Sequence, residues 1–349
     1  MAVVPDAFAP DSAVALSAPP PGARHPVVAF ILRRTGAGLA TLLAVSVLIF
    51  LATNVLPGNV AVVVLGRNAS PANVQRLERE LQINHSVPAR YLRWLGNAVQ
   101  GDFGRSAVAE AENRPNSSIS SSLGAPLRNS FWLAGFTTLL LIPLTLILGA
   151  LAGIFAGRWL DHLISLPALV MGGLPEFVMG TLLIYIFFSK LRWLPPVALL
   201  SPGSSPLSDP EVLVLPVLTL LAVAVAGGVR QVRVGMADAL QQDYVQFARL
   251  NGVAERRVLA RYALRNALAP SVQIIAQNLQ YLVGGIIIVE SVFAYPGIGT
   301  YLVNAVTSRD VVEVQAAAIV LAALYIAINV LADLIVVFLV PRLRTGMSS

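Results

Sequence analysis

Six long apolar runs divide this sequence and constrain its fold more than any other feature. They lie at about 29–56, 129–156, 165–188, 212–236, 271–293 and 313–340. Each holds about twenty or more predominantly apolar residues, the length that a helix needs to cross the hydrocarbon core of a bilayer. Lipid offers a backbone no hydrogen bonds, so a run of this length spans as a helix that bonds its own polar groups. We therefore expect an all-α integral membrane protein with six transmembrane helices.

The segments around these runs predict the domain organisation. Residues 1–28 are rich in proline and alanine and contain no apolar run, which is typical of a disordered extension. Residues 57–128 are polar and mixed, so they predict one long segment between the first and second helices. The other five helices form a core over residues 129–344, which includes a basic loop at 238–270. Residues 345–349 remain as a short tail.

The distribution of arginine predicts the orientation, because six spans place both termini on one side of the membrane. The flanks and short connections on that side carry Arg33, Arg34, Arg158, Arg230, Arg233, Arg249, Arg256, Arg257, Arg261, Arg265, Arg342 and Arg344. The short connections on the other side carry only Lys190, Arg192 and Arg309. Basic residues favour the cytoplasmic side, so both termini are expected there and residues 57–128 outside.

Several kinds of site are excluded by residue content. The chain has no cysteine, and its histidines, His25, His85 and His162, fall in three separate segments, so no metal site is expected. Its one lysine, Lys190, is followed by Leu191, so the chain lacks the Gly-Lys-Ser/Thr core of a phosphate-binding loop. We expect no catalytic residues, no nucleotide site and no nucleic-acid partner, with lipid around the spans.

The segment 246–270, QFARLNGVAERRVLARYALRNALAP, is basic and amphipathic although it lies between two apolar runs. Asp243 and Gln246 have capping-box spacing, which predicts a helix from Tyr244 with Tyr244, Phe247 and Ala248 on one face. Gly252 can supply the left-handed residue that ends this helix. A second helix is expected at about 254–268, and Pro270 would mark the turn into the next span. Such a segment suits either a lipid surface or a docking site for another protein, and its physics alone does not choose.

A resemblance favours the docking site. The stretch is similar to the EAA loop of the membrane subunits of ABC importers, in which a Glu-Ala-Ala trio, a later glycine and a Leu-Pro form the coupling helix. Here Gln246-Phe247-Ala248 stand at the trio, Gly252 at the glycine and Leu268-Ala269-Pro270 at the end. The texts DYVQFARLNG and ALRNALAP resemble the dipeptide/oligopeptide/nickel branch, with Gln246 in place of its arginine and Asn251 in place of its lysine.

The resemblance covers roughly residues 28–344. Further matching motifs, in the order of that branch, are FILRR (30–34), LPGN (56–59), GDFGRS (101–106), LPEF (174–177), VESVFAYPGIGTYL (289–302), Arg309-Asp310, Asn329 with Asp333, and PRLR (341–344). The shared order carries more weight than any single motif.

The resemblance implies one permease subunit, of type I architecture, of a peptide importer in the bacterial cytoplasmic (inner) membrane. Its implied partners are a second, similar permease, two ATPase subunits and an extracytoplasmic binding protein. The chain would be no enzyme and would bind no cofactor, because ATP and Mg²⁺ belong to the ATPases. The residues implied in ATPase coupling are Asp243, Tyr244, Gln246, Phe247, Ala248, Gly252, Glu255, Arg256, Arg261, Asn266 and Pro270.

Polar residues inside the apolar runs are candidates for the translocation path, because buried polar groups in a membrane are costly. The candidates are Glu176, Gln277, Glu290, Asn329 and Asp333. The alternative for each is a structural hydrogen bond between helices, which we favour for Glu290 and Asp333 near the interfaces. Glycines and prolines in the third and fifth runs predict either close packing or helices broken at the path, and the sequence leaves both open.

Other functions are weighed against the importer. The same machinery could carry nickel or another small solute instead of peptides. A self-contained channel or secondary transporter would need internal repeats and paired intramembrane charges, and no repeat is visible. A membrane-embedded enzyme would need a metal cluster or a nucleophile beside a base, and the runs show neither.

Overall fold

The computed structural model describes residues 26–54, 70–71, 74–75, 86–111, 118–200 and 206–339, and within these ranges every regular element is a helix. Most of the expected disordered extension at 1–28, the tail at 345–349 and much of the segment 57–128 lie outside the described residues. The long helices are α1 (Pro26–Asn54), α6 (Ile119–Ile154), α9 (Glu211–Gln241), α12 (Arg265–Val292) and α14 (Val311–Leu339). Shorter helices are α4 (Val87–Val99), α5 (Ala107–Ala111), α7 (Trp159–Gly172), α8 (Glu176–Ile184), α10 (Asp243–Leu250), α11 (Glu255–Arg257) and α13 (Ile298–Thr307).

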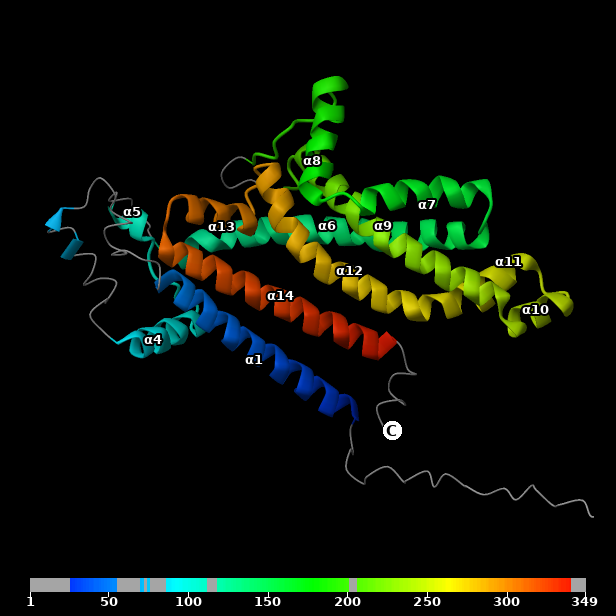
Figure 1. Ribbon diagram of the computed structural model, residues 1–349, viewed down its shortest axis with the longest axis horizontal. Helices are drawn as coiled ribbons and strands as arrows, with labels where there is room; N and C mark the ends of the chain where they lie inside the picture. Colours follow the sequence, from blue (N-terminus) through cyan, green and yellow to red (C-terminus); the bar gives the residue numbers. More distant parts are fainter. Residues whose placement is uncertain are drawn as a thin grey trace, which may run out of the picture.

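The long helices share one general direction, with α4, α5 and α13 at one end and α10 and α11 at the other (Figure 1). Within the described part of the chain, α1, α6, α9 and α14 are each long and apolar enough to cross a membrane. The helix α12, with 28 residues, lies where the fifth span was expected. The all-α membrane fold is therefore confirmed.

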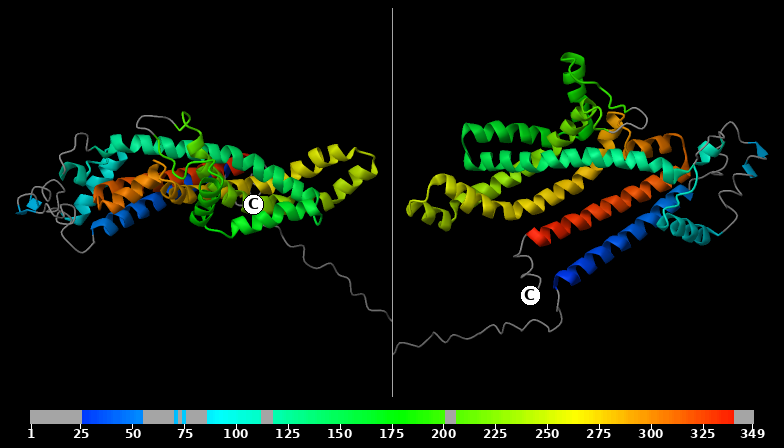
Figure 2. Two further views of the ribbon diagram at one scale, coloured as in Figure 1. Left: turned by 90° about the horizontal axis from the view of Figure 1, so that it is seen from above. Right: turned by 180° about the vertical axis from the view of Figure 1, so that it is seen from behind.

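The third expected span, at 165–188, is wrong as a single helix. It consists of α7 and of α8 with its π-helical continuation Tyr185–Lys190, which are bent by 110° relative to each other. The break falls at Gly173-Leu174-Pro175. Proline disfavours a helical conformation in the residue before it and has no N–H, so it starts a new helix more readily than it continues one. Figures 1 and 2 show α8 turned away from the direction that the long helices share.

Helix α9 lies at the centre of the bundle, because 72% of its apolar window is buried, compared with 11% for α1 and for α14. Its contact with α6 depends on two glycines four residues apart. A Cβ at position 149 would lie 2.5 Å from Cβ of Val232, and one at position 153 would lie 2.7 Å from the carbonyl oxygen of Arg233. Small residues at this spacing allow two membrane helices to approach backbone to backbone.

The outermost pair, α1 and α14, is held by polar contacts near its two ends. Arg34 of α1 forms an ion pair with Asp333 of α14, and Gln315 donates a 2.6 Å hydrogen bond to Thr53 near the opposite end. Figure 1 shows the two helices side by side. These contacts span the pair along its length.

Helix α4, in the long segment that follows α1, packs back onto α1. In α4, the Tyr91 hydroxyl lies 2.8 Å from the Ser46 hydroxyl, and the Tyr91 ring packs edge-on against Phe50. Arg90 of α4 stacks over the same Phe50 ring, 5.9 Å from its centroid. Helix α4 is thereby attached to the first span.

Gly153→Ala is expected to lower the melting temperature of the detergent-solubilised protein, because the added methyl overlaps backbone of α9 and forces the helices apart. Overpacking of this kind costs about 1–3 kcal/mol. The matched control is Gly135→Ala on the same helix, where a Cβ meets nothing within 4 Å in the described structure. Equal melting temperatures for the two variants, measured by thermal aggregation, would contradict the close α6–α9 contact.

Candidate functional site

The basic loop between α9 and α12 forms a hairpin of α10, a tight turn, α11 and the π-helical stretch Val258–Leu264. We name it the coupling hairpin (residues 243–264). Helix α10 ends where the sequence predicts, because Gly252 adopts the left-handed conformation with φ of 74°. The Gly252 N–H donates to the Arg249 carbonyl at 3.0 Å, and the Val253 N–H donates to the Ala248 carbonyl at 3.1 Å. These two bonds satisfy carbonyls at the helix end and form a Schellman motif.

The start of α10 differs from the prediction. Gln242 is the N-cap and makes no side-chain capping bond, and Asp243 is the first helical residue, so the predicted capping box at Asp243 and Gln246 is wrong. Gln242 already has extended backbone, which places Asp243 one position inside the helix. An acidic side chain in the first turn still complements the positive end of the helix dipole.

Helix α10 has one buried and one exposed face. Val245 and Ala248 are 0% and 4% exposed and pack against Val258, with Val253 and Tyr262 around them. Tyr244, Phe247 and Leu250 are 39%, 69% and 86% exposed. The predicted common face of Tyr244, Phe247 and Ala248 is therefore divided, with Ala248 turned into the hairpin.

Leu250 belongs to the exposed face and was missed by the sequence analysis. It lies three residues after Phe247, so helical spacing could have found it. Large apolar side chains displayed together on an otherwise polar end of a protein mark a contact surface.

An ion pair closes the coupling hairpin. The Arg249 guanidinium donates to both oxygens of Glu255, at 2.7 and 3.1 Å, across the turn at Gly252. This bond lowers the pKa of the Glu255 carboxyl and raises that of Arg249. Glu255, expected to couple to the ATPase, is thus engaged within the loop, whereas Arg256, Arg257 and Arg261 are exposed.

The second half of the loop is longer than predicted. The helix that begins at Glu255 continues through the π-helical stretch Val258–Leu264 into α12, so its expected end at 268 and the turn at Pro270 are wrong. Asn266 and Pro270 lie within α12. A proline removes one backbone bond, which membrane helices tolerate where neighbouring structure compensates.

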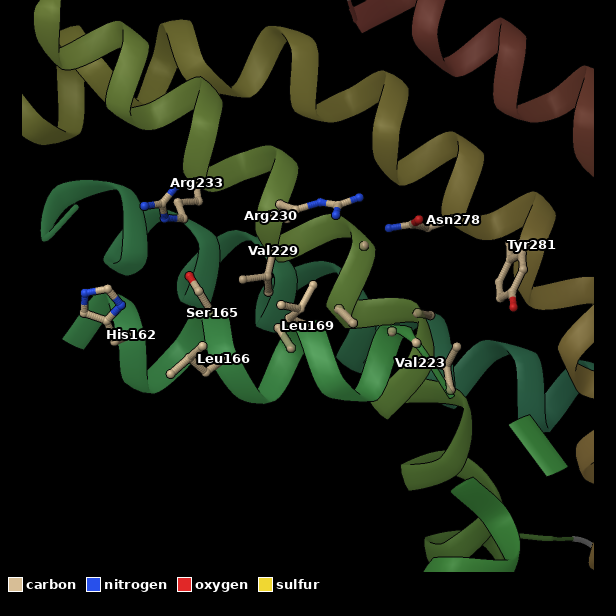
Figure 3. A pocket seen from close by; sticks show the side chains of 16 residues that line it. His162, Ser165, Leu166, Leu169, Val223, Val229, Arg230, Arg233, Asn278 and Tyr281 are labelled. Atoms are coloured by element: carbon tan, nitrogen blue, oxygen red, sulfur yellow. The ribbon is translucent and has the colours of Figure 1, made fainter. Parts of the chain in front are cut away.

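A cavity of about 660 Å³ lies between α7, α9 and α12 (Figure 3). Its polar lining residues are His162 and Ser165 of α7, Arg230 and Arg233 of α9, and Asn278 and Tyr281 of α12. The Arg233 guanidinium donates to Asp161 through two bonds of 2.5 and 2.6 Å, and Asp161 also accepts the Gly157 N–H at 2.8 Å. This pair of a buried Asp161 and a partly exposed Arg233 ties the start of α7 to α9.

The candidate path residues fall in different surroundings. Glu176 is buried and lines a second cavity, of about 580 Å³, between α8, α12 and α14. Tyr281 lines both cavities. Gln277 is exposed on α12. The Asn329 side-chain oxygen is buried and has no partner among the described residues, whereas Asp333 is paired with Arg34.

Glu290 forms the centre of a polar cluster at the opposite end from the coupling hairpin, which we name the Glu290 cluster (residues 129–130, 290 and 295–299). Its carboxylate is fully buried and accepts the Ser130 hydroxyl and the Gly299 N–H, the latter at 2.7 Å. The Ile298 N–H donates to Ser130 at 2.9 Å, and the Tyr295 hydroxyl donates to the Asn129 carbonyl at 2.8 Å. The structure therefore shows Glu290 holding the first turn of α13, which agrees with the structural alternative for this residue.

Asp310 is another buried acid whose carboxylate joins helices. The sequence analysis noted Asp310 only as part of the Arg309-Asp310 motif and missed this role. One of its oxygens accepts the Val312 and Glu313 N–H groups at the start of α14, each at 3.1 Å. The other accepts the Ser106 hydroxyl at 2.6 Å and the Val108 N–H at 3.0 Å, at the start of α5. One carboxylate thereby caps two helices and joins GDFGRS to Arg309-Asp310.

An all-helical membrane bundle with cavities between its helices and an amphipathic hairpin displayed at one end is the architecture of a transport component. Comparison with known families supports this class. The model of the binding-protein-dependent transport system inner membrane component matches residues 145–345, and the model of the N-terminal part of such components matches residues 27–115. The chain belongs to this family of ABC-importer permease subunits.

Individual relatives agree along nearly the whole chain. A protein of Brucella abortus (strain 2308), provisionally named as a peptide transport system permease, is 32% identical over 318 residues, which are 91% of this chain and 99% of the relative. A similarly named protein of Brucella suis biovar 1 (strain 1330) is 33% identical over 320 residues, 90% of this chain and 98% of the relative. The glutathione transport system permease protein GsiC of Escherichia coli (strain K12) is 32% identical over 316 residues, 90% of this chain and 98% of GsiC.

Membership of the family settles the coarse features of the protein. It is a multi-pass component of the inner membrane and a transport permease. Permeases of this family work with ATPase and substrate-binding partners.

Glu290→Gln is expected to lower the melting temperature of the solubilised protein. An amide offers only one acceptor oxygen, so either the Ser130 hydroxyl or the Gly299 N–H loses its partner, at a cost of about 1–3 kcal/mol. Glu211→Gln, at the exposed start of α9, is the matched control. Equal melting temperatures for the two variants would show that the Glu290 cluster does not depend on the Glu290 carboxylate.

Proposed function

We propose that this chain is one permease subunit of an ATP-driven importer that takes up peptides, and that it forms half of the transmembrane path. The observation that carries the proposal is the exposed apolar face of Tyr244, Phe247 and Leu250, mounted on a hairpin whose other face is buried. A short helix held in this way can fit a cleft of an ATPase and transmit its motion.

The contacts below the coupling hairpin give a physical route from that face to the cavity. Val245 and Ala248 pack on Val258, and the adjoining residues Met236, Ala239, Ala263 and Ala267 form a second buried cluster between α9 and the start of α12. The same two helices form walls of the 660 Å³ cavity farther along. Displacement of α10 as a rigid body would therefore move the cavity walls, as alternation between inward-open and outward-open states requires.

The orientation in this proposal has both termini in the cytoplasm. The start of α1, the end of α14 and the coupling hairpin lie toward the same end of the bundle (Figure 1). Exposed Arg158, between α6 and α7, and the exposed arginines of the hairpin are in the short connections that the positive-inside rule assigns to the cytoplasm.

The partners in this proposal are a second, similar permease, two ATPase subunits that hold ATP and Mg²⁺, and an extracytoplasmic binding protein. This chain itself binds no cofactor. The described outer elements α4, α5 and α13 would form part of the surface on which the binding protein docks. Peptides are the proposed substrate because relatives named for peptide and glutathione transport match along nearly the whole chain; nickel and other small solutes remain alternatives within the same machinery.

The proposal is tested by purifying the tagged chain from native membranes in mild detergent and identifying its partners by mass spectrometry. An ATPase and a second permease in stoichiometric amounts are expected, together with ATP-dependent peptide uptake by the reconstituted complex and its binding protein. A chain that purifies alone and stable would assign the coupling hairpin to the lipid surface and favour a self-contained channel.

Gly252→Glu is expected to abolish uptake while ATP hydrolysis by the complex continues, because it adds a charge beside the docking face and a side chain at positive φ. Gly252→Asn is the control, since asparagine tolerates the left-handed conformation and adds no charge. Uptake and ATPase rates are measured on the same proteoliposomes. Normal uptake by Gly252→Glu would refute the coupling role of the hairpin.

A further inference from the structure

The two cavities beside α12 carry opposite charges. Glu176 is the one acidic residue that lines the smaller cavity, and the larger cavity is lined by Arg230, Arg233 and His162 with no acidic residue. Arg233 is neutralised by Asp161, so the uncompensated cation of the larger cavity is Arg230. Tyr281 lines both cavities, which makes them neighbours along one face of α12.

The larger cavity is lined by a guanidinium with no acidic partner. The Arg230 side chain is exposed and extends from α9 along the cavity (Figure 3). No ion pair to Arg230 occurs among the described residues. A guanidinium that faces a cavity suits a carboxylate, which can accept two of its hydrogen bonds at once.

The smaller cavity is lined by the Glu176 carboxylate. The Glu176 carboxylate lies against Gly285, where a Cβ would be 3.3 Å from its Oε1 atom. The structure describes no cation beside it. A carboxylate that is buried in a membrane protein beside a cavity suits an ammonium group that enters from the cavity.

Along α12, the positions that line the two ends are spaced by about the length of a short peptide. Asn278 and Gly285 are seven residues apart on α12, which corresponds to about 10 Å along the helix axis. An extended chain covers about 3.3–3.6 Å per residue, so about three residues separate an amine from a carboxylate at this distance.

We propose that the Glu176 and Arg230 ends form one binding region for a zwitterionic short peptide, with Glu176 facing its terminal amine and Arg230 facing its terminal carboxylate. This assignment rests on the proposed function and names the chemical groups of the substrate that the transmembrane path recognises. Glu176 was foreseen from the sequence as a path residue. Arg230 was counted only as a marker of membrane orientation, because its distance from Glu176 is set by the packing of α9 on α12.

The first test measures the polarity of each end without any substrate. The chain has no cysteine, so a single introduced cysteine reports one position. Gly227 lines the larger cavity and Gly284 the smaller one, and a Cβ at either position meets nothing within 4 Å. Gly227→Cys and Gly284→Cys are made in the full chain, purified with its partner subunits and treated with anionic or cationic methanethiosulfonate reagents.

The anionic reagent is expected to label Gly227→Cys about tenfold faster than the cationic one, as one nearby charge dictates, and Gly284→Cys should show the reverse preference. Arg230→Gln should remove the first preference and Arg230→Lys should retain it, while Glu176→Gln should remove the second. Rates are followed by intact-mass spectrometry of this subunit. Equal labelling by both reagents, or preferences that survive the Gln substitutions, would overturn the proposal.

The second test measures uptake of trialanine by proteoliposomes with an unchanged binding protein, whose own preference for peptide termini is then the same in every sample. Glu176→Gln and Arg230→Gln are each expected to lower the uptake rate about tenfold, as the loss of a charged hydrogen bond implies. Arg158→Gln, an exposed arginine outside both cavities, should leave uptake unchanged. Normal uptake by both cavity variants overturns the binding region alone, whereas a wild-type complex that takes up no peptide overturns the proposed function.

Discussion

The close contact between α6 and α9 is the constraint on which the rest of the bundle depends. In lipid there is no hydrophobic drive to bring apolar helices together, so their association relies on close packing and on polar contacts. Gly149 and Gly153 let the backbone of α6 approach α9 within the distance that any side chain would block. With α9 held there, α7, α8 and α12 pack on its other sides, and both cavities form along α12.

Four acids are buried among the described residues, and three of them stabilise contacts between structural elements, whereas Glu176 does not. Asp161, Glu290 and Asp310 each accept backbone N–H groups together with a hydroxyl or a guanidinium, so their charges are compensated within the structure. Asp310 directly precedes α14, and Glu290, near the end of α12, accepts an N–H group from the start of α13; at both helix starts the helix dipole favours a negative charge. Glu176 likewise begins a helix, but it faces a cavity and Tyr281. The number of fixed donors around a carboxylate thus separates a structural role from one that a substrate can complete.

The coupling hairpin and the cavity are parts of one mechanical unit. Helix α9 ends at the hairpin, α12 begins after it, and both helices wall the cavity, so two helices connect the hairpin directly to the cavity. The Schellman turn at Gly252 and the Arg249–Glu255 pair stiffen the hairpin. A stiff hairpin transmits displacement, whereas a flexible one would absorb it.

The sequence by itself determined the membrane fold, continuous helices at five of the six predicted runs, the left-handed turn at Gly252 and the family, because apolar length, glycine and motif order are local properties. Only the tertiary structure decided that Ala248 faces inward, that the third span breaks at Gly173-Leu174-Pro175 into two helices at 110°, and that the helix after Glu255 runs past Pro270. It also decided which residues the acids meet, Glu290 with Ser130 and Gly299 and Asp333 with Arg34, and it placed Arg230 on the wall of a cavity. These outcomes depend on contacts between segments far apart in the chain, and the packing of one helix on another sets them.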